Sequence, residues 1–81
     1  MYMKANDYTN DAEGLVSALC AEVNAVRRAN RVKIVDISAR TGISPPHISS
    51  ILHGKMRPTA LTLARIAVAA GVRLRAEAAE E

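Results

Sequence analysis

Most of the basic side chains of this 81-residue sequence are concentrated in its middle. Ten lysines and arginines lie between Arg27 and Arg75, against a single acid, Asp36, which gives this part of the chain a balance of +9. The other seven acids lie in residues 7–22 and 77–81, so the net charge of the whole chain is only +3. A basic segment of this kind is the electrostatic signature of a surface that binds phosphate, above all a nucleic-acid backbone. The alternative is a solvated positive face without a partner.

A turn between two short apolar segments lies inside this basic region, within residues 35–52. Gly42 stands where a first helix must end, because the residue after a helix often needs the left-handed backbone that glycine adopts easily. Ser44 is placed to cap a second helix with its hydroxyl. Pro45 and Pro46 fit the first turn of that helix, where missing N–H groups break no intrahelical bond. The pattern predicts a helix-turn-helix, a unit that usually places its second helix in the major groove of DNA.

Few residues suggest chemistry other than binding. His47 and His53 are six positions apart, about 240° around a helix, so they cannot hold a metal ion together. The sequence has no glycine-rich phosphate loop, no metalloprotease motif and no pair of acids placed for acid–base catalysis. Cys20 lies on an apolar stripe, and we interpret it as a small core residue instead of a reactive thiol. We therefore expect no enzyme activity, no metal site and no cofactor.

A long amphipathic helix is expected before the helix-turn-helix. Asn10 followed by Glu13 fits a capping box at its start, although Asn replaces the usual Ser or Thr. Apolar residues then recur at helical spacing as far as Val26. The helix is expected to cover about residues 11–29, with residues 1–9 as a loose N-terminal arm.

Turn and capping residues define the other elements. The two helices of the helix-turn-helix are expected at about residues 34–41 and 45–53. Thr59 is a good N-cap for a last helix, which Gly71 ends. The chain then divides into a loose arm, one domain and a frayed acidic tail: residues 1–9, residues 10–76 with the helix-turn-helix at about 34–53, and residues 77–81.

Length and composition favour an all-α fold of four to five short helices around this central helix-turn-helix. Eighty-one residues make one domain, and without Trp or Phe its core must consist of Leu, Ile, Val and Ala. No apolar run reaches the roughly 18 residues that a membrane span requires, and the N-terminus lacks the apolar stretch of a signal peptide. A lone cysteine fits a reducing compartment. These features predict a cytoplasmic protein with no membrane partner.

The segment after the last helix alternates apolar and charged residues. Val72, Leu74 and Ala76 would share one face of a strand, with Arg73 and Arg75 on the other face. An exposed edge strand is a liability unless it is paired, and the same strand of a second copy is an obvious partner. Two alternatives stay open: a short C-terminal strand at a homodimer interface, and an extension packed on the first helix of its own chain.

The sequence from about Lys33 to Val72, half of the chain, resembles the Cro/lambda-repressor-like (Xre-type) helix-turn-helix family. The resemblance lies mainly in the glycine–hydrophobic–serine turn at residues 42–44 and in the Gly-Lys-x-Arg-Pro loop at residues 54–58. It implies a small all-α DNA-binding protein. Members of the family are mostly transcriptional repressors of phage, plasmid or bacterial origin that bind operators as dimers, and some antitoxins share the domain.

The resemblance assigns base-reading positions near the start of the second helix to Pro45 and Pro46, and a third to Ser50. Family members often carry polar side chains, such as Gln, at the first two positions. Proline has no side-chain donor or acceptor, so it can pack against a thymine methyl group but cannot make bidentate contacts with adenine or guanine. Direct reading of bases then falls to His47, Ser49 and Ser50.

Phosphate contacts are assigned by the same resemblance, most directly to Lys55 and Arg57 in the loop after the second helix. Where the family often has a phosphate-contacting Gln at the start of the first helix, this chain has Ile34, and the neighbouring Lys33 is expected to supply the contact. The full set of phosphate-contact candidates is Lys33, Arg40, Ser44, His53, Lys55 and Arg57. For the serines and histidines the alternative is a capping or plain surface role.

Two hypotheses of function follow. The first is a sequence-specific regulator that binds double-stranded DNA, namely a dimeric repressor on an inverted-repeat operator. The second is a protein-interaction module, such as an antitoxin that neutralises a toxin or a phage factor that binds a host protein. A non-specific nucleoid-type binder is a third option, because prolines occupy two base-reading positions. A salt-dependent affinity for DNA would separate the first hypothesis from the second.

Overall fold

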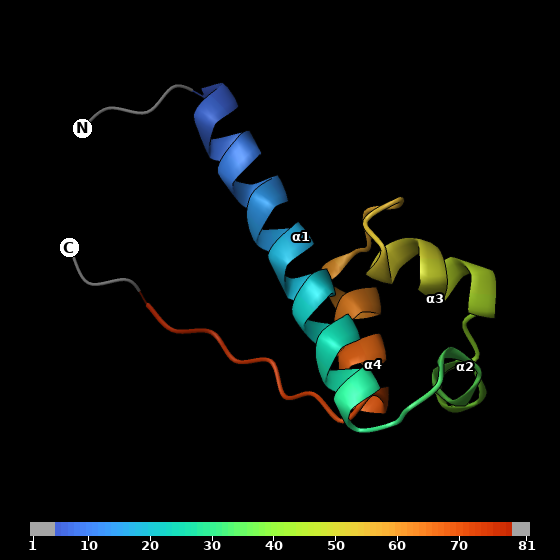
Figure 1. The fold of residues 1–81 in the computed structure, drawn as a ribbon. Helices are drawn as coiled ribbons and strands as arrows, with labels where there is room; N and C mark the ends of the chain where they lie inside the picture. Colours follow the sequence, from blue (N-terminus) through green and yellow to red (C-terminus); the bar gives the residue numbers. More distant parts are fainter. Residues whose placement is uncertain (1–4, 79–81) are drawn as a thin grey trace.

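Four α-helices and short connections make up residues 5–78, the part of the chain that the computed structural model describes (Figure 1). The helices are α1 (Ala5–Ala29), α2 (Ile34–Thr41), α3 (Pro45–Leu52) and α4 (Ala60–Ala69). Side chains are described from residue 7 onward. The expected all-α fold is confirmed, and none of the described helices is long and apolar enough to cross a membrane.

The core is aliphatic, as the composition predicts. Contacts join α2 to α3 and to α4, and α1 to α3, so the core lies where the helices meet. The buried apolar residues are Cys20, Val23, Ile37, Ile48, Ile51, Leu52, Leu63, Ile66, Ala67, Ala70 and Val72. Each fully buried isoleucine contributes about 1.5–3 kcal/mol through burial. Four fully buried isoleucines and one valine therefore form the centre of the domain.

The turn between α2 and α3 forms as expected, with one exception at Ser44. Gly42 ends α2 with a left-handed backbone (φ 77°) and donates its N–H to Ser38 O at 2.8 Å. Ser44 has the extended backbone of an N-cap, but its side chain makes no capping hydrogen bond, so that expectation is wrong. An N-cap hydroxyl accepts from the N–H of the second or third helical residue, and the second one here, Pro46, has none.

Helix α1 has 25 residues and begins earlier than expected. Its described part starts at Ala5, so Asn10 and Glu13 lie inside the helix and mark no boundary. Residues 5–9, expected in a loose arm, are helical, and residues 1–4 of that arm lie outside the described part. The helix continues because an interior Asn costs only a few tenths of a kcal/mol, while Asp7 in the first turn favours it through the helix dipole.

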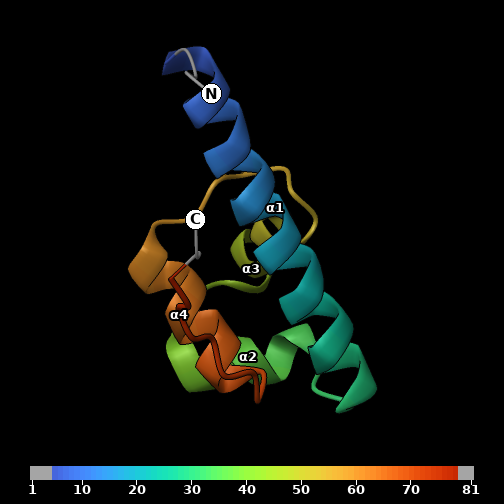
Figure 2. The ribbon, with the colours of Figure 1, turned by 90° about the vertical axis from the view of Figure 1, so that its left-hand side faces the viewer.

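The N-terminal half of α1 projects past the rest of the molecule (Figures 1 and 2). Side chains 7–12 are all exposed, and burial increases only toward Val16 and Cys20. This half of the helix therefore has little packing to the body, in contrast to the second half, which contributes Val23 to the core.

The segment after α4 forms no strand over residues 72–78, so the expected C-terminal strand is absent from this chain. A strand needs a hydrogen-bonding neighbour, and the described residues of one copy provide none. Val72 is only 8% exposed and belongs to the core, with its N–H bonded to Ala67 O at 2.8 Å. Leu74 and Ala76 are exposed. Residues 79–81 of the acidic tail lie outside the described part.

Candidate nucleic-acid interface

The start of α3 forms an exposed edge of the molecule, beside α2 (Figure 1). Pro45, Pro46 and His47 are exposed, and Ser49 and Ser50 are half-buried. The apolar residues on the other side of the helix are buried: Ile48, Ile51 and Leu52. The five base-contact candidates are therefore brought together on the accessible side of one short helix.

The two prolines reduce the hydrogen bonds that the start of α3 can offer. They occupy the first two helical positions, where backbone N–H groups often bind phosphate at a helix N-terminus. The exposed hydroxyl of Ser44 makes no capping bond, so it can donate to an external oxygen. Phosphate binding must therefore rely more on side chains here than at an ordinary helix start.

His53 closes the other end of α3. Its Nδ1 lies 2.8 Å from Ser49 O and 3.3 Å from Ser49 Oγ. A carbonyl only accepts, so Nδ1 carries the hydrogen in this arrangement, and the neutral ring has an acceptor at Nε2. In this tautomer the ring offers no free N–H to a phosphate.

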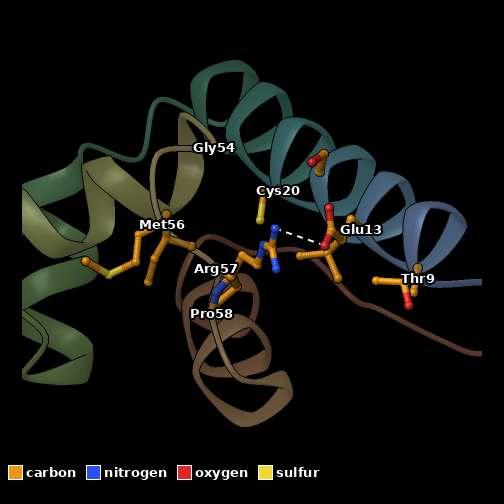
Figure 3. Close-up of a pocket in the computed structure, with 11 residues that line it drawn as sticks. Thr9, Glu13, Cys20, Gly54, Met56, Arg57 and Pro58 are labelled. Atoms are coloured by element: carbon orange, nitrogen blue, oxygen red, sulfur yellow. Dashed lines mark ion pairs between the residues drawn. The ribbon is translucent and has the colours of Figure 1, made fainter. Parts of the chain in front are cut away.

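The loop after α3 carries two exposed cations, Lys55 and Arg57. Backbone bonds fix its start, since Lys55 N–H donates to Ser50 O at 2.8 Å. Gly54 permits the turn with a φ of 75°. The Lys55 ammonium has no hydrogen-bond or ion-pair partner among the described residues, and it is free to bind an anion. Arg57, by contrast, forms an ion pair with Glu13 of α1, with Nη2 and Oε1 2.9 Å apart (Figure 3).

Two arginines, one in α2 and one in α4, make bonds inside the protein. Arg40 Nη1 donates to Ala69 O at 2.7 Å, and Arg65 Nη2 donates to Thr41 O. Each guanidinium thus lies at the negative C-terminal end of the other helix, and together they link α2 to α4. The bond to Ala69 occupies one nitrogen of the exposed Arg40 guanidinium, which leaves its other N–H donors for a phosphate. The only sequence signal for this arrangement is an arginine in the last turn of α2.

Asp36, the single acid of the basic region, has a structural role. Its Oδ2 accepts the backbone N–H of Lys33 at 2.9 Å, at the start of α2. Asp36 contacts the backbone of Lys33 and not its ammonium group, and the Lys33 side chain remains exposed. The ammonium of Lys33 is therefore still available to a phosphate.

The described residues contain no group of three or more His, Cys, Asp or Glu that could hold a metal ion. The expectation that Cys20 is a core residue is confirmed, since only 3% of it is exposed. Burial raises the pKa of the Cys20 thiol above its ordinary value. The reactive thiolate is therefore disfavoured at neutral pH.

One of three comparisons with known proteins gives a match, to a protein family. No curated protein and no solved structure matches the chain. A family model described as helix-turn-helix matches residues 23–76, about two thirds of the sequence. The matched part contains α2, α3 and α4, together with the end of α1. The chain therefore belongs to the Xre/Cro-like helix-turn-helix family of DNA-binding regulators.

Proposed function

We propose that this protein is a transcriptional repressor, without catalytic activity, that binds an inverted-repeat operator in double-stranded DNA as a homodimer. The observation that carries the proposal is the exposed side of α3, together with the loop after its C-terminal end, which carries the free ammonium of Lys55. In this arrangement α3 lies in the major groove while the loop holds the DNA backbone. Because the function needs access to DNA, we also propose a cytoplasmic location.

Base recognition in this proposal is limited by the side chains at the start of α3. Pro45 and Pro46 contribute contacts with thymine methyl groups, while His47, Ser49 and Ser50 supply hydrogen bonds. None of these forms the bidentate pairs that give the strongest discrimination. We therefore expect a substantial part of the specificity to come from DNA shape and deformability.

A second copy of the chain compensates for this weakness. One short recognition helix gives too few base contacts to find one site in a genome, and two-fold pairing doubles them. Val72 is buried in its own chain and is not available for pairing. Leu61 and Val68 lie on one side of α4 and are 70% and 75% exposed. Val68 lines a shallow groove together with Leu74. We name Leu61, Val68 and Leu74 the α4 strip and propose it as the contact between the two copies.

An antitoxin that binds a partner protein is the second candidate function, with DNA binding for autoregulation. It is supported by the projecting half of α1, where Tyr8 and Leu15 are 59% and 62% exposed. These two residues are seven positions apart and share one side of the helix. An apolar stripe of this kind suits a partner protein more than it suits DNA.

The experiment is a titration of fluorescent duplex DNA at several salt concentrations, followed by selection of bound sequences from random DNA. A dimer with on the order of ten phosphate contacts should lose several orders of magnitude of affinity between about 50 and 200 mM salt. The selected sequences should contain two inverted half-sites about 34–36 Å apart. A salt-independent affinity would contradict DNA binding of this kind. A selection that yields no repeat would favour a non-specific binder.

A further inference from the structure

The N-terminal half of α1 reaches the DNA-facing loop through one acidic side chain. The carboxylate of Glu13 forms the ion pair with Arg57 (Figure 3), and both residues line a pocket together with Val16 and Cys20. The two side chains are 40% and 77% exposed, so neither is locked in place by packing. The contact joins α1 to the loop after α3, which are distant in sequence. The same loop also carries Lys55.

A carboxylate and a phosphate are alternative partners for a guanidinium. Arginine binds both through the same fork of N–H donors. If Glu13 stayed in place on DNA, two anions would lie on one guanidinium, and their repulsion would weaken the phosphate contact. Repulsion between the two anions therefore favours the release of Glu13 when Arg57 binds the DNA backbone.

We propose that Glu13 is an internal competitor of DNA phosphate for Arg57. This inference rests on the proposed role of Arg57 as a phosphate contact. The free protein holds Arg57 on the carboxylate of α1, and DNA binding replaces that carboxylate with a phosphate oxygen. The ion pair thus lowers the affinity for DNA, and it links the N-terminal half of α1 to the occupancy of the interface.

The first test compares Glu13→Gln with the wild-type chain in the same DNA titration. Glutamine keeps the size and the helix propensity of glutamate but removes its charge. An exposed ion pair shifts an equilibrium by up to about five-fold, so the variant should bind DNA about two- to five-fold more tightly at low salt. The difference should shrink as the salt concentration rises from about 50 to 200 mM, because screening weakens an exposed ion pair.

The matched control is Asp11→Asn, which removes the same charge from an exposed position of α1 two residues away. We expect it to change the affinity for DNA much less than Glu13→Gln does. If both variants tighten binding equally, the effect comes from the overall field of α1, and the proposal is overturned.

A double-mutant cycle separates this proposal from the proposed function. Arg57→Gln should weaken DNA binding, and adding Glu13→Gln to it should then have no further effect. If Glu13→Gln still tightens binding in that background, Glu13 does not act through Arg57. If Arg57→Gln leaves the affinity unchanged, the competition is also refuted, while the salt dependence of the wild-type protein continues to report DNA binding by itself.

Discussion

Two prolines determine what the start of α3 offers to DNA. Pro45 and Pro46 occupy its first two positions, where they remove two N–H donors and place side chains without polar atoms at the two positions that the family resemblance assigns to base reading. Pro46 also removes one of the two N–H groups with which an N-cap hydroxyl such as that of Ser44 usually bonds. The energy of DNA binding must then come mostly from cations around the helix. Of the two cations in the loop after α3, Lys55 has no partner among the described residues, whereas Arg57 is paired with Glu13.

The residue-scale prediction compares the loop with the recognition helix. Lys55→Ala is expected to weaken binding to every DNA sequence by the same factor, because a phosphate contact carries no sequence information. It should also reduce the salt slope by about one for each subunit. Ser50→Ala should instead change the preference at one base pair, by about 1–3 kcal/mol where the contact is direct. Both are measured by titrations with an operator and with random duplex DNA.

The roles of these residues would be reversed if Lys55→Ala changed base preference and left non-specific affinity intact. His47→Ala serves as the companion to Ser50→Ala, since both side chains lie on the accessible side of α3. An unchanged preference in both variants would leave shape readout as the main source of specificity.

The sequence could predict which candidate residues gather around α3, but it could not predict which of them already have partners inside the protein. Pattern and resemblance place Arg57 in the loop after α3, and the structure agrees. Its pairing with Glu13 depends on how far α1 extends and where it passes the loop, which is a tertiary property. The bond from Arg40 to Ala69 could not be predicted either, because these residues are 29 positions apart and meet only in the folded chain.

At the scale of elements, the sequence could predict a helix end where the backbone needs a positive φ that glycine adopts easily. It could not predict a helix end that depended only on a capping preference. Gly42 and Gly71 both adopt a positive φ at a helix end, a conformation that few other residues tolerate. Asn10 only favours a cap, and the chain stays helical through it. The alternation at residues 72–76 favours a strand, but a strand forms only against a neighbour.

The reciprocal arginines should stabilise the packing of α2 on α4. Arg65→Met is expected to lower the free energy of unfolding by about 0.3–1 kcal/mol, the range for a cation at the C-terminal end of a helix. This corresponds to a fall of a few degrees in Tm for a domain of this size. Thermal unfolding followed by circular dichroism measures it. Arg73→Met is the control, because Arg73 is exposed and no contact with a helix end is found for it. Equal losses in both variants would show that the Arg65 bond contributes nothing.

At the scale of the whole molecule, the elements divide the surface by function. The acids that precede Arg27 lie on α1, whose N-terminal half projects from the body. In contrast, α3 and its basic loop lie on the side opposite to the C-terminal tail, and α4 lies on the tail side (Figures 1 and 2). A second copy that binds through the α4 strip would therefore leave both recognition helices free for DNA.

This arrangement makes Val68→Asp the decisive variant for the dimer. At 75% exposure, Val68 contributes little to the folded monomer, so the helical circular dichroism should be kept. At a two-fold contact, however, the substitution places two unpaired carboxylates in an apolar interface, which is strongly unfavourable. Light scattering should then show a monomer. Operator affinity should fall by about 10²–10⁴-fold, which is the gain that linking two binding units provides. Leu15→Asp, at an apolar position of α1 that is 62% exposed, should leave the dimer intact. If Leu15→Asp dissociates the dimer and Val68→Asp does not, the contact lies on the projecting half of α1.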